Sequence, residues 1–354
     1  MSTSRPRTLD PANLDPLVTY LAHALGAERV RVSSAELLSG GAVQENWSLY
    51  VEVVGGPRAG SARWVLRTDA AARLPVSLDR TGEFAVLQTA NAAGVRIAEP
   101  ILECADAAVI GAPFMLQAFL AGTAQARRLV RTPDLAAWGG DVAVELAHQL
   151  AKIHAIRPGL NSAERLSFLP QPLLPPARAE VARLRGMLDG AGEARPALEY
   201  ALTWLDQNAP APNPLCLVHG DYRTGNYMVA DGQLSAILDW EFAHWGDPLE
   251  DIGWFCARCW RFGNDAMEAG GIARRDVFVD AYVHTSDLSV RPADIIYWEV
   301  MAAVKWAAIA VLQGDRYRKG GEDAIELVLT GLMPSEMELD ALLLIEQLEG
   351  TQNG

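Results

Sequence analysis

The chain has 354 residues, which is enough for two structural units and more than one compact core usually needs. Half of the residues are apolar or aromatic and about a fifth are charged, a composition that excludes a disordered or fibrous protein. The net charge of -14 disfavours nucleic acid and anionic membranes as partners, and it would suit a cationic or metal-bound substrate.

Cysteine content and the longest apolar stretch both favour a soluble protein of the cytoplasm. The chain contains four scattered cysteines: Cys104, Cys216, Cys256 and Cys259. They are too few for a disulfide framework, and the Cys-x-x-Cys pair has no second pair to complete a metal site, so we expect buried small side chains. Residues 1–15 contain no apolar secretion signal, and the apolar stretch at 300–312 is broken by Lys305 and is shorter than the ~20 residues of a membrane span.

Short β-rich runs alternate with glycine turns in the first third of the chain. They predict five strands of a twisted antiparallel sheet, at residues 30–38, 47–54, 63–68, 99–103 and 113–119. A helix is predicted between the third and fourth strands, at residues 78–93, because Phe84, Leu87 and Ala90 recur at helical spacing and Gly94 follows as a stop signal.

Beyond about Gly122 the pattern becomes helical, with helices predicted at residues 141–156, 176–189, 196–207 and 295–313. Three short strands interrupt it at residues 215–218, 227–229 and 234–238. A small β island within a helical region usually presents a site. The sequence therefore predicts an α+β protein, with a sheet-containing first part and a mostly helical second part.

The most informative segment follows the first of these short strands and reads H-G-D-Y-R-T-G-N from His219 to Asn226, with D-W-E beginning at Asp239. This pattern resembles the aminoglycoside phosphotransferase and choline kinase superfamily, a relative of the protein kinases. The later G-D-P-x-x-D, ending at Asp251, is most similar to phosphotransferase domains fused to, or encoded beside, acyl-CoA dehydrogenases. The resemblance implies a protein-kinase-like bilobal fold, with a nucleotide-binding lobe at 1–117 and a catalytic and substrate-binding lobe at 118–354.

Phosphoryl transfer explains the residue types in this segment, because it requires an oriented hydroxyl and neutralised phosphate charge. Asp221 is the candidate catalytic carboxylate that orients the hydroxyl and accepts its proton. Asn226 and Asp239 offer the oxygen ligands that Mg²⁺ prefers. Each could instead cap a turn, but their joint spacing favours the catalytic interpretation. His219 and Gly220 are expected to shape the loop.

A helix start is predicted directly after this segment. Asp247 is the expected N-cap, a proline follows at the first helical position, and Glu250 would complete a capping box. We expect structural roles for Asp247 and Asp251, which would brace the site from the helix start, and local packing for His244.

The resemblance extends to the first part of the chain. Gly40 and Gly41 lie between the first two predicted strands, where such folds cover the nucleotide phosphates with a loop, although a plain hairpin turn also explains them. Arg67 ends the third strand where relatives place a phosphate-binding lysine, and Glu83 matches its carboxylate partner. A surface ion pair is the alternative.

The adenine of the nucleotide is expected near the end of the fifth strand. The resemblance places Gln117, Ala118 and Leu120 there, and backbone atoms would make the hydrogen bonds. Because side chains contribute little to such contacts, the sequence does not separate ATP from GTP.

These observations predict an ATP- and Mg²⁺-dependent kinase that transfers the γ-phosphate to a hydroxyl of a small molecule, acting as a monomer or homodimer. The resemblance favours a hydroxyacyl-CoA or hydroxy acid as the acceptor, whereas the acidic charge would suit an aminoglycoside or amino alcohol. Two other classes stay open. One is a non-catalytic nucleotide-binding pseudokinase, which the arginine in place of lysine invites. The other is a metal-dependent hydrolase, which usually needs a denser cluster of ligands.

Overall fold

The computed structural model describes residues 9–38, 44–69, 77–320 and 324–352. The chain divides into two compact units. The small unit comprises Met1–Gly122 together with Ser235–Ala243, and the large unit comprises Thr123–Leu234 together with His244–Gly354. The segment that carries Asp239 therefore belongs to the small unit, although it lies more than a hundred residues beyond the rest of it in sequence.

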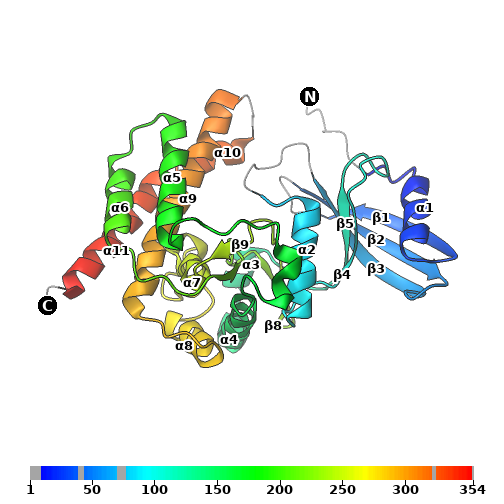
Figure 1. Cartoon of the computed structure of the whole chain (residues 1–354), viewed down its shortest axis with the longest axis horizontal. Coiled ribbons are helices and arrows are strands. Elements are labelled where there is room, and N and C mark those ends of the chain that lie inside the picture. The colour runs from blue at the N-terminus through cyan, green and yellow to red at the C-terminus, as the bar shows by residue number, and fades with distance from the viewer. Residues whose placement is uncertain (1–8, 39–43, 70–76, 321–323, 353–354) are drawn as a thin grey trace. The chain divides into compact units, whose positions relative to one another are not determined.

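The small unit contains a five-stranded antiparallel sheet in the order β1-β2-β3-β5-β4 (Figure 1). Its strands are β1 (Arg29–Leu37), β2 (Gln44–Val54), β3 (Gly60–Asp69), β4 (Pro100–Cys104) and β5 (Phe114–Ala118). The five predicted strands and their antiparallel pairing are confirmed. The predicted phosphate loop with Gly40 and Gly41 lies outside the described residues.

Two helices accompany this sheet. Helix α2 (Arg80–Ala92) confirms the predicted helix, and its N-cap Asp79 accepts a hydrogen bond from the Gly82 N–H at 2.7 Å. Helix α1 (Asp15–Ala24) was not predicted, because the opening segment reads as polar and proline-containing. It buries Leu17 and Leu21 in a core with the inward side chains of the sheet.

The large unit is mostly helical. Its helices are α3 (Ala126–Val130), α4 (Leu135–His154), α5 (Pro176–Ala191), α6 (Pro196–Gln207), α7 (Pro248–Cys256), α8 (Arg275–Thr285), α9 (Pro292–Gly320), α10 (Ile325–Gly331) and α11 (Pro334–Gln352), with short 3-10 helices η1 (Asn161–Leu166) and η2 (Arg258–Trp260). Helix α9 packs against α5, α6, α7, α10 and α11 (Figure 1). The four predicted helices are confirmed, although α4 begins at Leu135 rather than Asp141.

One helix among the described residues, over Pro292–Lys319 of α9, is long and apolar enough to cross a membrane by length and composition alone. Because 78% of its most apolar window is buried inside the structure, the same pattern is that of a core helix.

Two small sheets interrupt the helices. Strand β6 (Cys216–Val218) pairs with β9 (His244–Gly246), and β7 (Tyr227–Ala230) pairs with β8 (Gln233–Ile237). Asp231 and Gly232 form the tight turn of the second pair with φ of 49° and 72°. The three predicted strands are confirmed, and the short β9 was not predicted.

The Cys-x-x-Cys pair straddles the end of a helix. Cys256 is the last residue of α7 and is fully buried, as predicted. Cys259 lies in η2 and is only partly buried, so the expectation of a buried side chain is wrong for this residue. Helix α7 ends between the two residues, because the backbone of Ala257 is extended with ψ of 140°.

Candidate active site

The loop at residues 219–226 follows the buried strand β6 and is held at its start by Asp251 of α7. The fully buried Asp251 carboxylate accepts the backbone N–H of His219 at 2.7 Å and that of Gly220 at 2.9 Å. Nε2 of His154 lies 3.2 Å from the same carboxylate. Gly220 has a φ of 79°, a conformation that favours glycine. Helix α7 therefore fixes the backbone directly before Asp221.

The Asp221 carboxylate is surrounded by donors. Its Oδ1 accepts a hydrogen bond from Nε1 of Trp254 at 2.7 Å, and its Oδ2 accepts one from Nδ2 of Asn226 at 2.6 Å. Nε of Arg223 lies 3.0 Å from Oδ1 and 3.1 Å from Oδ2. The carboxylate is therefore held in one orientation within a residue that is 9% exposed.

Asn226 closes the loop onto Asp221. Its Nδ2 also donates to the backbone oxygen of Asp221 at 2.9 Å, and its own N–H donates to the backbone oxygen of Arg223 at 2.9 Å. Because Nδ2 is committed to Asp221, Oδ1 is the side-chain atom left to bind a hard cation. The preceding Gly225 has a φ of 112°, and a Cβ there would lie 2.8 Å from Nη1 of Arg223.

A cluster of tryptophans supports the loop. The ring centroids of Trp254 and Trp260 are 5.2 Å apart, and those of Trp260 and Trp306 are 4.9 Å apart. The Arg223 guanidinium lies over the Trp260 ring at 4.4 Å, within the range of a cation–π contact. The Trp254 indole, which donates to Asp221, thus packs against the Trp260 indole, which lies under Arg223.

Lys305 ties α9 to the same loop. Its Nζ donates to the backbone oxygen of Gly220 at 3.1 Å and pairs with Oε1 of Glu250 at 3.2 Å. The ammonium also lies 4.8 Å from the centroid of the Trp254 ring. This lysine, which interrupts the apolar stretch in the sequence, is therefore a partly buried partner of the candidate active site.

The start of α7 follows its prediction in part. Asp247 is the N-cap and accepts the N–H of Leu249 at 2.9 Å. Glu250 does not complete a capping box, because its carboxylate pairs with Lys305 and with Nε2 of His244 at 3.2 Å. Tertiary ion pairing replaces the local hydrogen bond that the sequence predicts.

The small unit contains a second group of charged side chains. Nη1 of Arg67 pairs with Oε1 of Glu83 at 3.0 Å, and Nη2 of Arg67 pairs with Oδ1 of Asp239 at 3.3 Å. Glu83 is fully buried and also contacts Arg80 from the previous turn of α2. Burial lowers the pKa of Arg67, but the nearby carboxylates of Glu83 and Asp239 outweigh it and the pKa is raised.

Asp239 adopts the left-handed backbone conformation, with a φ of 65°. Non-glycine residues in this region often mark functional sites. Its side chain is 32% exposed, so the carboxylate keeps access to a ligand besides Arg67. Among the described residues, no cluster of three or more His, Cys, Asp or Glu side chains is placed to hold a metal ion.

The predicted adenine contacts lie at the end of β5. Gln117 is 6% exposed, and the N–H of Ala118 donates to the backbone oxygen of Glu99 at 2.9 Å. That donor is therefore already used within the small unit. The N–H of Leu120 has no partner among the described residues, which leaves it the donor available to a ligand.

The structure thus brings Asp221 together with Asn226, and Arg67 together with Glu83 and Asp239. The sequence did not predict the contacts that Trp254 and Arg223 make with Asp221, or the contact of Lys305 with Gly220. For Arg223 a signal existed, since it lies two residues after the candidate catalytic aspartate and carries the opposite charge. The other two are distant in sequence, and no local pattern marks them.

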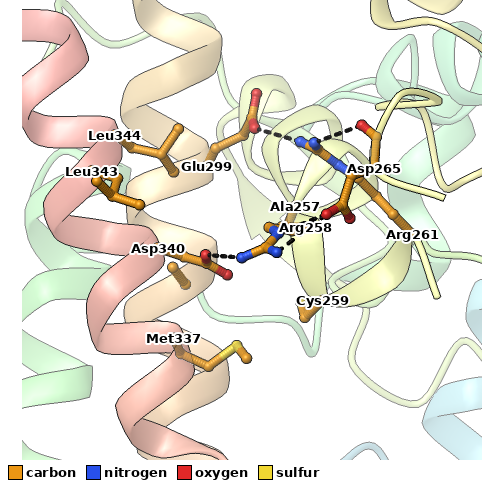
Figure 2. Close-up of a pocket in the computed structure, with 11 residues that line it drawn as sticks. Ala257, Arg258, Cys259, Arg261, Asp265, Glu299, Met337, Asp340, Leu343 and Leu344 are labelled. Atoms are coloured by element: carbon orange, nitrogen blue, oxygen red, sulfur yellow. Dashed lines mark hydrogen bonds and ion pairs between the residues drawn. The ribbon is translucent and has the colours of Figure 1, made fainter. Parts of the chain in front are cut away.

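A cavity of about 390 Å³ opens beside the tryptophan cluster in the large unit (Figure 2). Figure 2 shows Glu299 on α9 and a group of α11 side chains facing residues of η2 and the following turn. The lining includes Cys259 and Arg261, the chain neighbours of Trp260, whose ring lies under Arg223, but it includes neither Asp221 nor Arg223 itself. The lining residues are Ala257, Arg258, Cys259, Arg261, Asp265, Glu299, Ala303, Met337, Asp340, Leu343 and Leu344.

Charges in this cavity are paired. Arg258 contacts Asp340 at 2.8 Å and Asp265 at 3.1 Å. Arg261 contacts Glu299 at 3.3 Å, and Arg275 reaches the same carboxylate at 2.7 Å. The lining thus holds three carboxylates and two guanidinium groups, Arg275 contacts Glu299 from outside the lining and is shared with Glu268, and the remaining wall is apolar.

Solved structures with the same fold are phosphotransferases and kinases of small molecules. A Ralstonia eutropha protein assigned to the aminoglycoside phosphotransferases superposes with a TM-score of 0.74 at 19% identity, covering 95% of this chain and 98% of that one. An aminoglycoside phosphotransferase in ternary complex with AMP-PNP and hygromycin B gives 0.58 at 14% identity, covering 94% and 98%. The Plasmodium vivax ethanolamine kinase gives 0.57 at 12% identity, covering 86% and 81%.

Curated relatives come from acyl-CoA dehydrogenase family proteins. Family member 11 of Rattus norvegicus is 25% identical over 285 residues, which are 77% of this chain and 36% of the rat protein. Family member 10 of Mus musculus is 26% identical over 249 residues, which are 68% of this chain and 22% of the mouse protein. The match therefore covers about a third of the length of the rat protein and less than a quarter of the mouse protein.

The five-stranded sheet followed by helices, with a loop of catalytic type after β6, is the kinase-like fold of these solved structures. Residues 35–284, well over half of the chain, match the phosphotransferase enzyme family. The chain belongs to this family. The predicted fold class, the predicted resemblance and the assignment as a small-molecule kinase are confirmed.

Proposed function

We propose that the protein transfers the γ-phosphate of ATP, with Mg²⁺, to a hydroxyl group of a small molecule. The observation that carries this proposal is the Asp221 carboxylate, which is fixed by Trp254 and Asn226 near the start of a backbone-anchored loop. A carboxylate held in this way orients a hydroxyl for in-line attack and accepts its proton. Two of the solved relatives were crystallised with nucleotides, AMP-PNP in one and GDP in the other.

The donor set suits the metal. Oδ1 of Asn226 and the carboxylate of Asp239 are hard oxygen ligands, and Mg²⁺ typically takes one or two carboxylates together with substrate phosphates and water. When bound, the ion would neutralise phosphate charge. Arg67, oriented by Glu83, supplies a further cation for the phosphates, in place of the lysine common in relatives.

We place nucleotide binding in a lobe at residues 1–117 and catalysis and acceptor binding at residues 118–354. Gly40 and Gly41 would cover the phosphates. Gln117, Ala118 and Leu120 would surround the purine, with the Leu120 N–H as its backbone donor. We further propose a cytoplasmic protein, monomeric or homodimeric, without nucleic-acid or membrane partners.

We propose that this cavity takes the acceptor, and its apolar wall favours an acceptor that carries an aliphatic part. A polycation would need carboxylates that lack counter-charges, but Glu299, Asp265 and Asp340 are already paired with arginines. The α11 wall is largely apolar, and Arg258 keeps 46% of its side chain exposed at the rim. A hydroxy acid or hydroxyacyl-CoA fits this lining better than an aminoglycoside or amino alcohol, despite the acidic net charge.

The test is a transfer screen with Mg²⁺-ATP across hydroxyacyl-CoAs, hydroxy acids, aminoglycosides and amino alcohols, read by product mass. We expect a phosphorylated hydroxy acid or hydroxyacyl-CoA, lost in Asp221→Asn. With the best acceptor, Arg258→Gln should raise KM about tenfold while kcat changes little, since a hydrogen bond to a charged group contributes about 1.5–3 kcal/mol. The exposed Arg291→Gln is the matched control.

Two outcomes would contradict the proposal at different levels. Phosphorylation of aminoglycosides alone would overturn the acceptor class and leave the kinase intact. Nucleotide binding without transfer to any class of acceptor would instead support a non-catalytic nucleotide-binding module.

A further inference from the structure

Most of the hydrogen-bonding capacity of the Asp221 carboxylate is used by the protein itself. A carboxylate offers about four lone-pair sites on its two oxygens. In this structure Oδ1 faces Trp254 and Arg223, and Oδ2 faces Asn226 and Arg223. Because the Arg223 hydrogen is shared between both oxygens, a substrate hydroxyl that donates to Asp221 competes with these three donors for its lone pairs.

The three donors differ in how firmly they are held. Asn226 is 6% exposed and bonds both the side chain and the backbone of Asp221. Trp254 is 3% exposed and is packed within the tryptophan cluster. Arg223 is 24% exposed, and its Nε divides one hydrogen between two oxygens at 3.0 and 3.1 Å, the longest contacts of the set. Arg223 is therefore the donor that can leave.

A guanidinium is always charged, and another anion is the partner that best replaces a lost carboxylate. Trp260 gives Arg223 a flat support at 4.4 Å, on which the planar group can slide without losing its stacking contact. Next to a catalytic carboxylate of a kinase, the anion available is the phosphoryl group that is to be transferred.

We propose that Arg223 is a catalytic residue that moves from Asp221 to the γ-phosphoryl group when the nucleotide binds. This inference rests on the proposed kinase function. It implies that Asp221 becomes free to accept the acceptor hydroxyl only when the phosphoryl donor is present. One side chain thus couples nucleotide binding with activation of the acceptor.

The transfer step then balances as follows. The acceptor oxygen forms a bond to the γ-phosphorus, and the bond from that phosphorus to the bridging oxygen breaks, with its electron pair leaving on ADP. The hydroxyl proton passes to the Asp221 oxygen that Arg223 has left, and later to solvent. Arg223 offsets the negative charge on the transferred group throughout.

The experiment compares affinities for Mg²⁺-AMP-PNP and Mg²⁺-ADP by calorimetry, because the two ligands differ in the γ-phosphoryl group and no acceptor is needed. We expect Arg223→Gln to lose about ten- to hundredfold in affinity for AMP-PNP, as for one hydrogen bond to a charged group, and to bind ADP nearly as the unaltered protein does. Arg223→Lys should lose less, and the exposed Arg291→Gln should bind both ligands normally.

An unchanged ratio of the two affinities in Arg223→Gln would overturn the inference and leave the kinase assignment intact. Failure of the unaltered protein to bind either nucleotide would overturn the proposed function, and this inference with it. If Arg223→Gln does not fold, a crystal structure of the unaltered protein with Mg²⁺-AMP-PNP decides. Arg223 should then contact the γ-phosphate, and an Arg223 still bonded to Asp221 would contradict the inference.

Discussion

In the large unit the Asp221 and Asp251 carboxylates accept hydrogen bonds from backbone N–H groups and neutral side chains, and Asp221 also pairs with Arg223. In the small unit Arg67 and Glu83 are held by charge. Hydrogen bonds from fixed donors depend on geometry and are little affected by salt. A buried ion pair depends on both charges being present, because each has lost its hydration. The comparison indicates a catalytic loop fixed mainly by geometry and a charged site in the small unit that is stable only while both charges are present.

The largest effect should come from Asp221→Asn, which tests whether the rigid loop serves catalysis. The amide cannot take the hydroxyl proton, and its NH₂ group would face donors that now point at a carboxylate. Phosphate transfer should fall about 10²- to 10⁴-fold, the usual contribution of a positioned acid or base. Steady-state kinetics measures the loss, and AMP-PNP affinity should stay within about threefold, less than one hydrogen bond to a charged group.

Asp231→Asn is the matched control for this variant. Asp231 is exposed in the β7–β8 turn with a φ of 49°, a conformation that asparagine also tolerates. Equal losses of activity in both variants would show that the fall comes from something other than the Asp221 carboxylate.

Arg67→Met tests the charge-held site of the small unit. It leaves the fully buried Glu83 with Arg80 as its remaining cation, and we expect a loss of about 3 kcal/mol in the free energy of unfolding. Urea titration measures it. Arg67→Lys keeps the charge and should lose less, about 1 kcal/mol, because one ammonium cannot span two carboxylates as a guanidinium does.

The exposed pair of Arg58 and Glu99 in the same unit provides the reference, since Arg58→Met should change stability by less than about 1 kcal/mol. If Arg67→Met cost no more than this, the buried cluster would not depend on its charges and the contrast between the units would disappear.

The sequence predicted the features that depend on local pattern. Alternating β-rich runs identified the five strands, and helical spacing with Gly94 as a stop identified α2. The spacing of Asp221 and Asn226 was interpretable because one short loop contains both residues, and the structure joins them by hydrogen bonds. Their catalytic roles stay predictions.

Tertiary contacts could not be predicted in this way. Trp254 reaches Asp221 across 33 residues, and Lys305 reaches Gly220 across 85, so neither contact follows from a local pattern. The capping box at Glu250 failed for the same reason. A partly buried lysine from a distant helix offered that carboxylate a stronger partner than the backbone N–H at the helix start.

Asp251→Asn tests the backbone anchoring in the large unit. The carboxylate faces three groups, the N–H of His219, the N–H of Gly220 and Nε2 of His154, whereas an amide has one acceptor oxygen. At least one buried backbone donor would lose its partner, and we expect a loss of about 2 kcal/mol in unfolding free energy. Asp276→Asn, at an exposed position, should change stability little. A similar small change in Asp251→Asn would show that the loop does not need this anchor.

The smallest effect concerns the thiols, and it sharpens the picture of the cavity beside the rigid loop. Burial raises the pKa of Cys216 and Cys256, and it also raises that of Cys259, with the Asp340 carboxylate adding to the shift. A high pKa leaves little thiolate, which is the reactive form.

Among the thiols of the folded protein, we expect iodoacetamide at pH 8 to modify only Cys259, which lines the cavity and is partly buried. Its rate should be more than about tenfold lower than that of free cysteine. Peptide mass spectrometry against a urea-unfolded control measures the rates, and an acceptor bound in the cavity should slow Cys259 further. Rapid modification of Cys216 or Cys256 in the folded state would instead show that the packing around β6 and α7 opens readily, which is inconsistent with a loop held by fixed geometry.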